Sequence, residues 1–488
     1  MAMAEHLAIR NLTSMPIILK RIERFHGPEK ARNGSLAKSF TRLVTNATRA
    51  DGSVALIAED SKPFEHKDVD IHVGPFKTIH TEIRSHIDSD KERIRWLFDV
   101  DGEQHQIQTP VPTTETASMK PLSENAKLRF TGIYTLAASH LAVFASANMN
   151  AWMKELQDKT LLSSLSIPGT HNTPTCHRAP PSVRCQAVSP REQLQNGVRF
   201  FDIRVQPESP EDEFNDELAL VHGKFPISLT GDKYFRDLER EVIDFLEHNP
   251  SETLIISLKR EGPGSHTDEQ LSRIIRDHYA RQGSRWYTDP KIPTLGEARG
   301  KIVLVRRFDI LEELKEIHGG RGWGINANGW ADNCANATCP SGQIVIQDFY
   351  KVLESQNIDQ KIQYVTEHCK RASETCYPFG ILPGPKATRA HPFYVNFLSA
   401  SNFFHRGTWP EKIAAKLNPA TVDHLCRRHG EKEGADWSTG ILVTDWVGLD
   451  GDWDIVRAVV GLNAKLMLRQ RQGNDHEEDH HEEEHEWD

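Results

Sequence analysis

The sequence predicts an α/β protein: an irregular (β/α) barrel of the TIM type, preceded by a β-rich, sandwich-like N-terminal domain. Three observations lead to this prediction. From residue 165 onward, short apolar runs alternate with helical segments, a pattern typical of a parallel sheet. Several of these runs end in an ionisable side chain, as barrel strands do at the face that holds an active site. Before residue 147, short β-prone runs follow one another without helices between them.

The first 147 residues are predicted to form a β-rich accessory domain. Runs such as Asp68–Val73 and Arg93–Val100 are separated by charged or Gly-, Asn- and Asp-bearing turns, a spacing typical of a β-sandwich. This segment shows no set of chemically convergent residues, so we expect it to bind a membrane or a partner. An amphipathic helix is predicted at Asn148–Leu162, leading into the second domain.

Residues 148–470 are predicted to form the barrel. The expected strands are Leu165–Ile167, Val198–Val205, Leu218–Val221, Thr253–Lys259, Lys301–Arg307, Gln343–Gln347, Tyr394–Leu398 and Gly440–Thr444, and the expected helices include Tyr234–His248, Thr267–Ala280 and Asp454–Leu468. The first of these helices ends at Asn249-Pro250, a stop signal. The gap between His171 and Gly197 has weak helical character, which predicts that the barrel is irregular.

Residues 471–488 are predicted to be a disordered, acidic, His-rich tail. The chain of 488 residues has a net charge of -10, and nearly all of it comes from this tail. Four tail histidines offer a weak transition-metal site, but a solvated tail is the favoured interpretation. The remaining body is nearly neutral and lacks the basic footprint of a nucleic-acid binder. Its hydrophobic content of 38% is enough for a buried core.

The sequence contains no run of about 18 apolar residues, and its first 20 residues do not have the pattern of a secretory signal. A cytoplasmic or peripheral membrane location is therefore expected. Seven cysteines are present. Three close pairs (Cys176/Cys185, Cys334/Cys339 and Cys369/Cys376) suit local disulfides, which leaves Cys426 single, but free thiols are favoured because no export signal is found.

Three motifs follow one another in the first part of the barrel: Ser166-Ile167-Pro168-Gly169-Thr170-His171-Asn172, Phe200-Phe201-Asp202-Ile203-Arg204-Val205 and Leu220-Val221-His222-Gly223. Three more lie downstream, at Ile256–Lys259, Val345–Tyr350 and Val443–Trp446. In this order they resemble the X domain of phosphatidylinositol-specific phospholipases C, closest to the bacterial, metal-independent type. The resemblance covers about Leu165 to Leu468.

The resemblance implies a site that cleaves the glycerol–phosphate bond of an inositol phospholipid. His171 would be the general base and His222 the general acid, tasks that suit imidazole because its unperturbed pKa lies near neutrality. Asp445 matches the carboxylate that orients the base imidazole. Arg204 would bind a phosphoryl oxygen and stabilise charge in the transition state, and Asp202 would orient Arg204 or an imidazole.

Recognition of the inositol ring is expected from polar groups on later strands. The resemblance implies Lys259, Arg307, Asp348 and Tyr350, the last by stacking. For the arginine, strand parity leaves open whether Arg306 or Arg307 faces inward.

No metal and no other cofactor is predicted. In the calcium-dependent relatives an acidic residue occupies the strand position of Arg204 and recruits the ion, whereas a guanidinium supplies positive charge itself and cannot ligate calcium. Asn172 departs from the bacterial pattern, which has an acid there, and matches the calcium enzymes. An amide cannot polarise the acid imidazole as a carboxylate does, so calcium stays open as the disfavoured alternative and Asn172 is assigned to the substrate site.

The predicted function is therefore a phosphodiesterase that acts on phosphatidylinositol or a glycosylated form and yields diacylglycerol and inositol cyclic phosphate. Its expected partners are the inositol phospholipid and, transiently, a membrane surface, with no nucleic acid; no oligomeric state is predicted. Two alternatives stay open. One is a catalytically weak or inactive protein that binds lipid or a partner. The other is a metal-dependent glycerophosphodiesterase-like enzyme, which Arg204 argues against.

Overall fold

The computed structural model describes residues 6–26, 57, 61–84, 92–109, 118–135, 138–281, 283–352, 356–375, 377, 391–402, 405–430 and 435–471. Apart from Arg471, the predicted acidic tail lies outside the described residues, and so does the predicted Cys369/Cys376 pairing because Cys376 is not described.

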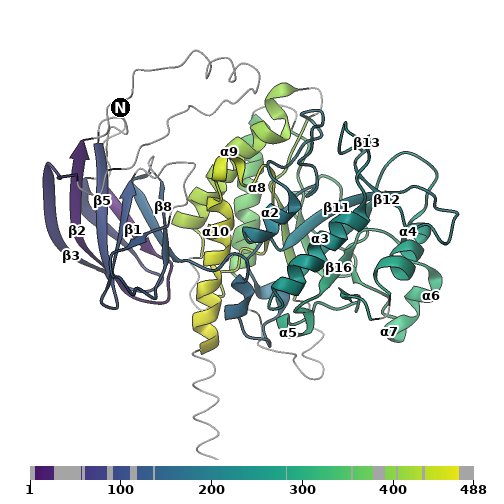
Figure 1. The fold of residues 1–488 in the computed structure, drawn as a ribbon, viewed down its shortest axis with the longest axis horizontal. Helices are drawn as coiled ribbons and strands as arrows, with labels where there is room; N and C mark the ends of the chain where they lie inside the picture. Colours follow the sequence, from purple (N-terminus) through teal and green to yellow (C-terminus); the bar gives the residue numbers. More distant parts are fainter. Residues whose placement is uncertain are drawn as a thin grey trace, which may run out of the picture. The chain divides into compact units, whose positions relative to one another are not determined.

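The chain divides into two compact units (Figure 1). The β-rich unit comprises Met1–Ser146 with Asp450–Asp454, and the barrel unit comprises Ala147–Leu449 with Ile455–Asp488. The accessory role that the sequence suggests for the β-rich unit stays a prediction.

The β-rich unit contains two sheets. Their strands are β1 His6–Asn11, β2 Ile17–His26, β3 Glu65–Val73, β4 Thr78–Arg84, β5 Glu92–Val100, β6 Glu103–Thr109, β7 Lys120–Pro121, β8 Phe130–Thr135 and β9 His140–Ala145. One sheet has the order β4-β1-β9-β8 and the other β3-β2-β5-β6-β7. All pairings are antiparallel except β1 with β9.

Both sheets contribute side chains to one hydrophobic core. Along β5, Ile94, Trp96, Phe98 and Val100 alternate with partly polar positions, as a half-buried strand requires. Side chains of β1 and β9 in the other sheet belong to the same cluster. The indole Nε1 of Trp96 donates a 2.8 Å hydrogen bond to Thr109 Oγ1, which satisfies its buried polar atom.

The barrel unit is built on a mostly parallel sheet. Its strands are β10 Ile167–Thr170, β11 Phe200–Pro207, β12 Leu218–His222, β13 Phe225–Pro226, β14 Leu254–Arg260, β15 Trp286–Tyr287, β16 Ile302–Arg306, β17 Ile325–Asn326, β18 Ala337–Thr338, β19 Ile344–Gln347, β20 Phe393–Phe397 and β21 Ile441–Thr444. Strands β16-β14-β11-β10-β21-β20-β19 are neighbours in this order and pair in parallel. Within the described residues no strand pairing closes the sheet between β17 and β19. The barrel is therefore irregular in that its sheet is open between β17 and β19 among the described residues.

Helices follow several of these strands. They are α2 Pro190–Gln195, α3 Phe235–His248, α4 Asp268–Ile274, α5 Leu295–Ala298, α6 Glu312–Lys315, α7 Ile317–Gly320, α8 Gln356–Ser373, α9 Pro410–Arg427 and α10 Asp454–Gly461, with short 3-10 turns at Trp152–Glu155 and Leu162–Ser164. Helix α3 buries one apolar face and ends at Asn249, immediately before Pro250, as predicted. The helix predicted at Asp454–Leu468 is confirmed: α10 is followed by a turn at Leu462 and by further helix from residue 463 to 471. The helix predicted at Thr267–Ala280 consists of α4 and a π-helical segment, Ile275–Tyr279.

The predicted helix at Asn148–Leu162 is wrong. The segment instead contains only the two 3-10 turns. Its carbonyl groups bind arginines from elsewhere in the unit: Arg199 donates to the carbonyls of Met149 and Asn150, and Arg299 to those of Met153 and Leu156. Because these carbonyls are satisfied by side chains, the backbone does not need a helix for its hydrogen bonds.

The predicted parallel strand that carries His222 is also wrong. Strand β12 pairs antiparallel with the C-terminal end of β11, Val205–Pro207, and then forms a hairpin with β13. A parallel crossover needs about a dozen or more residues, usually including a helix, whereas the ten residues from 208 to 217 contain no helix. His222 therefore comes from a hairpin that extends β11 and does not follow a barrel strand.

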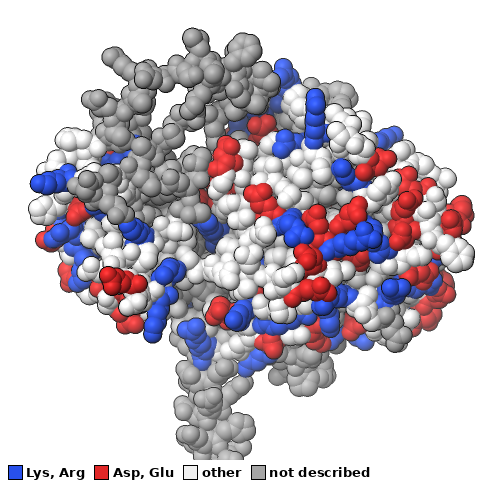
Figure 2. Space-filling view, in the orientation of Figure 1, with Lys and Arg blue, Asp and Glu red and all other residues white. Residues whose placement is uncertain are grey.

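The face of the barrel unit seen in Figure 2 has Lys and Arg side chains interspersed with Asp and Glu. Such mixing gives no single-sign field on that face. In the part of the chain that the structure describes, no helix combines the length and the apolar character needed to cross a bilayer.

Candidate active site

The parallel register of three neighbouring strands brings the first site residues together. Thr170 at the end of β10 is paired with Thr444 of β21 and with Phe201 of β11. The next residues, His171 and Asp445, therefore emerge side by side. Since carboxyl ends of parallel strands meet at one edge, residues far apart in the sequence share this rim.

His171 is held by a carboxylate on one side of its ring. Its Nδ1 lies 2.8 Å from Asp445 Oδ1, and the main-chain carbonyls of His171 and Thr444 both accept from Gln186 Nε2, at 2.7 and 2.9 Å. On the other side, Nη2 of Arg204 lies 3.1 Å from His171 Nε2. Because a guanidinium only donates, this contact requires an unprotonated Nε2, and the proton then resides on Nδ1 beside Asp445.

The charged groups around His171 favour its protonated form, whereas the Arg204 contact requires the neutral ring. Burial lowers the pKa of His171, but Asp445 and Cys185 raise it by more, so the net pKa is above that of an ordinary imidazole. The hydrogen bond from Arg204 is possible only with the neutral ring, whereas the Asp445 carboxylate stabilises the imidazolium. The ring is thus arranged both to accept a proton at Nε2 and to hold it.

His222 lies across from His171 and has a different partner. The two rings are 5.9 Å apart between centroids and nearly perpendicular. Nδ1 of His222 lies 2.8 Å from the main-chain carbonyl oxygen of Val183. A carbonyl only accepts, so this nitrogen carries the proton and Nε2 is the atom left for other contacts. Gly223, next in the hairpin turn, has a φ of 61°, which favours glycine.

Asn172 does not line the cavity described below. It is buried, with a φ of 42°, a conformation that Asn tolerates. Its backbone N–H donates to Asp202 Oδ2 at 3.2 Å, and its side-chain amide lies 3.4 Å from His171 Nε2. The contacts found for His222 are thus with Val183 and Cys185 rather than with residue 172.

Arg204 belongs to a network of charges. Its guanidinium donates to Asp202 at 3.3 Å and to both oxygens of Glu261 at 3.3 and 3.4 Å. Arg307 donates to the other oxygen of Asp202 at 3.1 Å. Burial alone would raise the pKa of Asp202, but Arg204 and Arg307 hold it below its usual value. Asp202 is fully buried and lies behind the cavity, so it positions two arginines and does not line the site.

A cavity of about 580 Å³ opens among these residues, a size typical of small-molecule sites. Of the residues named from the sequence, those on its wall are His171, Arg204, His222, Lys259, Arg307, Asp348, Tyr350 and Asp445. The guanidinium of Arg307 stacks on Trp330 with its carbon 3.6 Å from the ring centroid. Arg306 instead donates to the main-chain carbonyls of Trp323 and Phe308, away from this wall.

The surroundings shift the pKa values of two titratable groups on the wall, Asp348 and Tyr350. Burial raises the pKa of Asp348, although Arg307 and Lys361 oppose this. The hydroxyl of Tyr350 donates to Asp332 at 2.6 Å, and burial together with Asp332 raises the pKa of Tyr350 to about 12. Tyr350 is therefore a neutral aromatic surface at ordinary pH.

Sequence reasoning missed Glu261. This residue accepts from Lys259 at 2.7 Å and from the backbone N–H of Gly223 at 2.9 Å, in addition to Arg204. Burial would raise the pKa of Glu261, but Arg204 and Lys259 keep it far below its usual range. Strand parity could have found it, because Glu261 stands two residues after Lys259 on the same face of the strand end.

Sequence reasoning also missed Cys185 as a site residue. The described cysteines Cys176, Cys185, Cys334, Cys339, Cys369 and Cys426 are free thiols, so the bridges between Cys176 and Cys185 and between Cys334 and Cys339 are not formed. Sγ of Cys185 lies 3.8 Å from His222 Nδ1. Burial and Asp445 raise the pKa of Cys185, but His222 and His171 lower it further, to about 7. No pattern in the loop that carries Cys185 signals this position.

The fold and the rim define a phosphodiesterase-type barrel site with two imidazoles and a guanidinium. The family model for the X domain of phosphatidylinositol-specific phospholipase C matches residues 159–308. A 1-phosphatidylinositol phosphodiesterase of Listeria monocytogenes is 33% identical over 325 residues, which are 64% of this chain and 86% of that protein. The chain therefore belongs to the phosphatidylinositol-specific phospholipase C X-domain family, and the resemblance seen in the motifs is confirmed.

Further relatives agree with this assignment. A 1-phosphatidylinositol phosphodiesterase of Staphylococcus aureus is 25% identical over 342 residues, covering 67% of this chain and 98% of that protein. A solved structure of the Staphylococcus aureus phosphatidylinositol-specific phospholipase C is 24% identical, with a TM-score of 0.51, and covers 65% of this chain and 98% of its own. The structural likeness supports the TIM-barrel-type fold of the barrel unit.

Proposed function

We propose that this protein cleaves the glycerol–phosphate bond of phosphatidylinositol, or of a glycosylated form, and releases diacylglycerol and an inositol cyclic phosphate. The observation that carries the proposal is that His171 and His222, whose ring centroids are 5.9 Å apart, line one cavity together with Arg204. The reaction is an internal displacement: the inositol 2-hydroxyl oxygen bonds to phosphorus while the bond from phosphorus to the glycerol oxygen breaks.

His171 would act as the base in this reaction. Its Nε2 accepts the proton of the attacking hydroxyl, and Asp445 at Nδ1 stabilises the imidazolium that forms. For this to happen, Arg204 must release Nε2. A phosphoryl oxygen in the cavity would provide the guanidinium with a charged acceptor in place of the neutral ring nitrogen, and such charge-assisted bonds are the stronger ones.

His222 would act as the acid. Its Nε2 gives a proton to the departing glycerol oxygen, and the Val183 carbonyl fixes the ring by accepting from Nδ1. The substrate loses one proton to His171 and gains one from His222, so its net charge does not change.

Arg204 would stabilise the charge that builds on the phosphoryl oxygens. Its Nε is buried and, among the described residues, has no hydrogen-bond partner, so it is a donor aimed at no other group. Asp202 and Glu261 hold the guanidinium in a fixed plane. Preorganised donors of this kind typically supply a few kcal/mol of transition-state stabilisation.

The inositol ring would contact the polar wall formed by Lys259, Arg307, Asp348 and Tyr350. Asp348 and Lys259 offer an acceptor and a donor for ring hydroxyls, and the Tyr350 ring offers a stacking face. We also propose that no metal is required, since Arg204 supplies the positive charge for which calcium-dependent members use an ion.

We also propose roles for the β-rich unit and for contact with a membrane surface. We infer that the β-rich unit is a sandwich that binds membrane or a partner, on the basis of its shared core and its lack of a chemically convergent set. The substrate lies in a bilayer, so turnover requires transient contact of the barrel rim with that surface.

The proposal is tested by incubating the protein with phosphatidylinositol vesicles in EDTA and measuring release of diacylglycerol and inositol cyclic phosphate. Release by the wild type, and its loss in His171→Leu, is the expected result. No product from the wild type, with equal vesicle binding by both proteins, would leave a binding protein. Product that appears only when calcium is added would overturn the metal-free proposal.

A further inference from the structure

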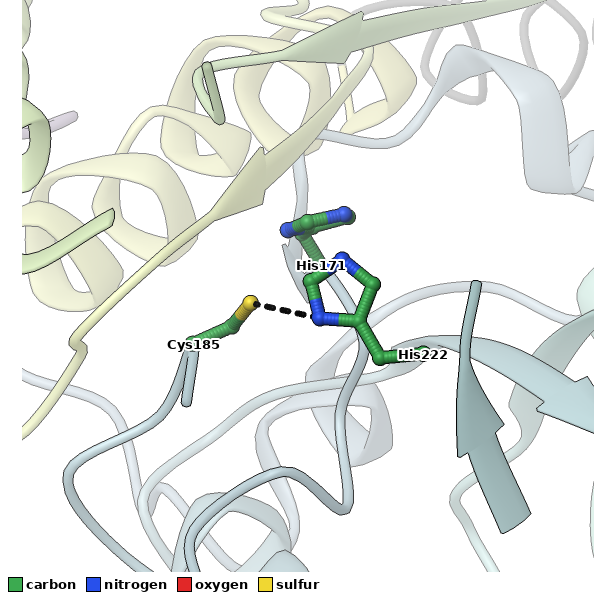
Figure 3. Close-up of side chains that lie close together, drawn as sticks. All are labelled: His171, Cys185 and His222. Atoms are coloured by element: carbon green, nitrogen blue, oxygen red, sulfur yellow. Dashed lines mark hydrogen bonds between the residues drawn. The ribbon is translucent and has the colours of Figure 1, made fainter. Parts of the chain in front are cut away.

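The thiol of Cys185 lies beside the two histidines of the site. One ring nitrogen of His171, one of His222 and Sγ of Cys185 all lie within 4.8 Å of one another, and Sγ is 3.8 Å from His222 Nδ1. Figure 3 shows the thiol directed toward the two imidazoles, with the contact to His222 dashed. Cys185 is completely buried. Three side chains of metal-ligating types therefore point at one small volume.

A carboxylate lies next to this cluster, in contact with His171. Asp445 is 1% exposed and lies on the wall of the same cavity. Its Oδ1 contacts His171, but its Oδ2 is buried and has no hydrogen-bond partner among the described residues. A buried carboxylate oxygen without a partner is costly unless something else binds it.

We propose that His171, Cys185 and His222 form a binding site for Zn²⁺, with the fourth position left to water or to the nearby Asp445 carboxylate, and that the bound ion inhibits the enzyme. The inhibition rests on the proposed function, whereas the binding does not. Zinc takes four N, S and O ligands in tetrahedral geometry, at about 2.0–2.3 Å. These lengths put neighbouring ligand atoms roughly 3.3–3.8 Å apart, so the three ligand atoms, which lie within 4.8 Å of one another, need shifts of no more than about 1.5 Å.

The donor set selects zinc over the ions common in lipid enzymes. Thiolate and imidazole suit zinc and similar soft or borderline metals, whereas Ca²⁺ and Mg²⁺ take oxygen ligands. The guanidinium of Arg204 pairs with Asp202 and Glu261. It also contacts His171 Nε2 and must release this nitrogen if the metal binds there. The thiolate and the Asp445 carboxylate can then neutralise the two charges of the ion.

Occupancy of this site is incompatible with turnover as proposed. A metal bound to both imidazoles uses nitrogen lone pairs that proton transfer requires. We therefore expect Zn²⁺ to inhibit turnover, and the chelator EDTA to restore activity.

The test uses Co²⁺ as a spectroscopic substitute for Zn²⁺ on the full chain with its thiols kept reduced. Binding at this site should produce a thiolate-to-cobalt charge-transfer band, which added Zn²⁺ removes. Cys185→Ser and Cys185→Ala should lose the band. Cys176→Ser, which removes a thiol of the same loop that lies outside the cluster, should keep it. The tail histidines cannot produce the band, because residues 474–488 contain no cysteine.

Zinc affinity is measured in parallel by competition with a chromophoric chelator. Loss of an outer-shell partner typically costs about 10–100-fold in metal affinity, so loss of the Cys185 ligand should cost at least about 100-fold. A wild type that shows no thiolate band, or a Cys185→Ala variant with unchanged zinc affinity, would overturn the site.

The ratio of turnover without and with zinc then tests inhibition. We expect saturating Zn²⁺ to abolish phosphatidylinositol cleavage by the wild type and to change the turnover of Cys185→Ala far less, while Ca²⁺ has no such effect on either. A zinc-saturated wild type that keeps full turnover would overturn the inhibitory role. A protein that shows the thiolate band but never cleaves phosphatidylinositol would instead overturn the proposed function and leave the site standing.

Discussion

The two histidines of the cavity are the same residue type, yet the protein holds them by different means. His171 has a buried carboxylate, Asp445, at Nδ1 and a guanidinium at Nε2. His222 has only a main-chain carbonyl, that of Val183, together with a thiol. A carboxylate stabilises the charged ring far more than a carbonyl does, so one ring is built to receive a proton and the other to give one up. The difference shows how environment, rather than residue type, divides acid from base.

The largest expected effect comes from removing either ring. His171→Leu and His222→Leu should each lower turnover of phosphatidylinositol by roughly 10²–10⁴-fold, because each removes one proton transfer from the transition state. Initial rates of diacylglycerol release measure this, with circular dichroism to check the fold. A variant that turns over at nearly the wild-type rate would show that the comparison assigns a role to the wrong ring.

Asp445→Asn should affect only the His171 side. Turnover should fall about 10²-fold or more, since the amide can hold the wrong tautomer. His171 must be neutral to act, and Asp445 raises its pKa. Removing the carboxylate charge lowers that pKa, so the acid limb of the pH–rate profile should move to lower pH.

An acid limb that does not move, or moves to higher pH, would contradict the pairing of Asp445 with the base.

Arg204→Lys should lower kcat by roughly 10²–10³-fold, the usual cost of losing a charge-stabilising donor. Lysine keeps the charge but cannot bridge Asp202 and Glu261 with a planar fork. Steady-state kinetics check this as a fall in kcat larger than any rise in KM. A change confined to KM would mean that Arg204 binds ground state and transition state equally.

The smallest effect is expected at residue 172. Asn172→Asp tests whether His222 gains from an acid there, as the bacterial pattern implies. The amide lies beside His171, and its backbone N–H contacts Asp202, so a new carboxylate would meet an existing one. We expect turnover to fall by no more than about 10-fold, the equivalent of one pKa unit. A rise in turnover would show that the acid side depends on residue 172 after all.

The grouping of residues around the proposed base, His171, was predictable from the sequence, whereas the surroundings of the proposed acid, His222, were predictable only in part. His171, Arg204 and Asp445 follow parallel strands, and the ends of such strands share one rim, so motif order alone brings them together. His222 sits on an antiparallel hairpin, and its partner is a backbone carbonyl from a loop. A carbonyl belongs to every residue, so no sequence pattern marks the one that is used.

In the fold as well, features set by local sequence were predicted, and features set by distant residues were not. The strands of the barrel unit that have four or more residues, and helix α3, were predicted within a few residues, because apolar runs and a Pro stop signal act locally. The two-residue strands were not predicted. The false helix at Asn148–Leu162 failed because Arg199 and Arg299, distant in the sequence, satisfy its carbonyls. Glu261 and Cys185 were missed for a related reason: their importance comes only from what the fold places next to them.

The most direct measurement of the division between base and acid uses a substrate whose leaving group needs no proton. The test compares phosphatidylinositol with an inositol phosphate ester of p-nitrophenol, in His171→Ala and in His222→Ala. We predict that His222→Ala regains turnover to within about 10-fold of the wild type on the nitrophenyl ester, while His171→Ala stays slow on both substrates. Rescue of His171→Ala instead, or of neither variant, would contradict the roles assigned here to the two histidines.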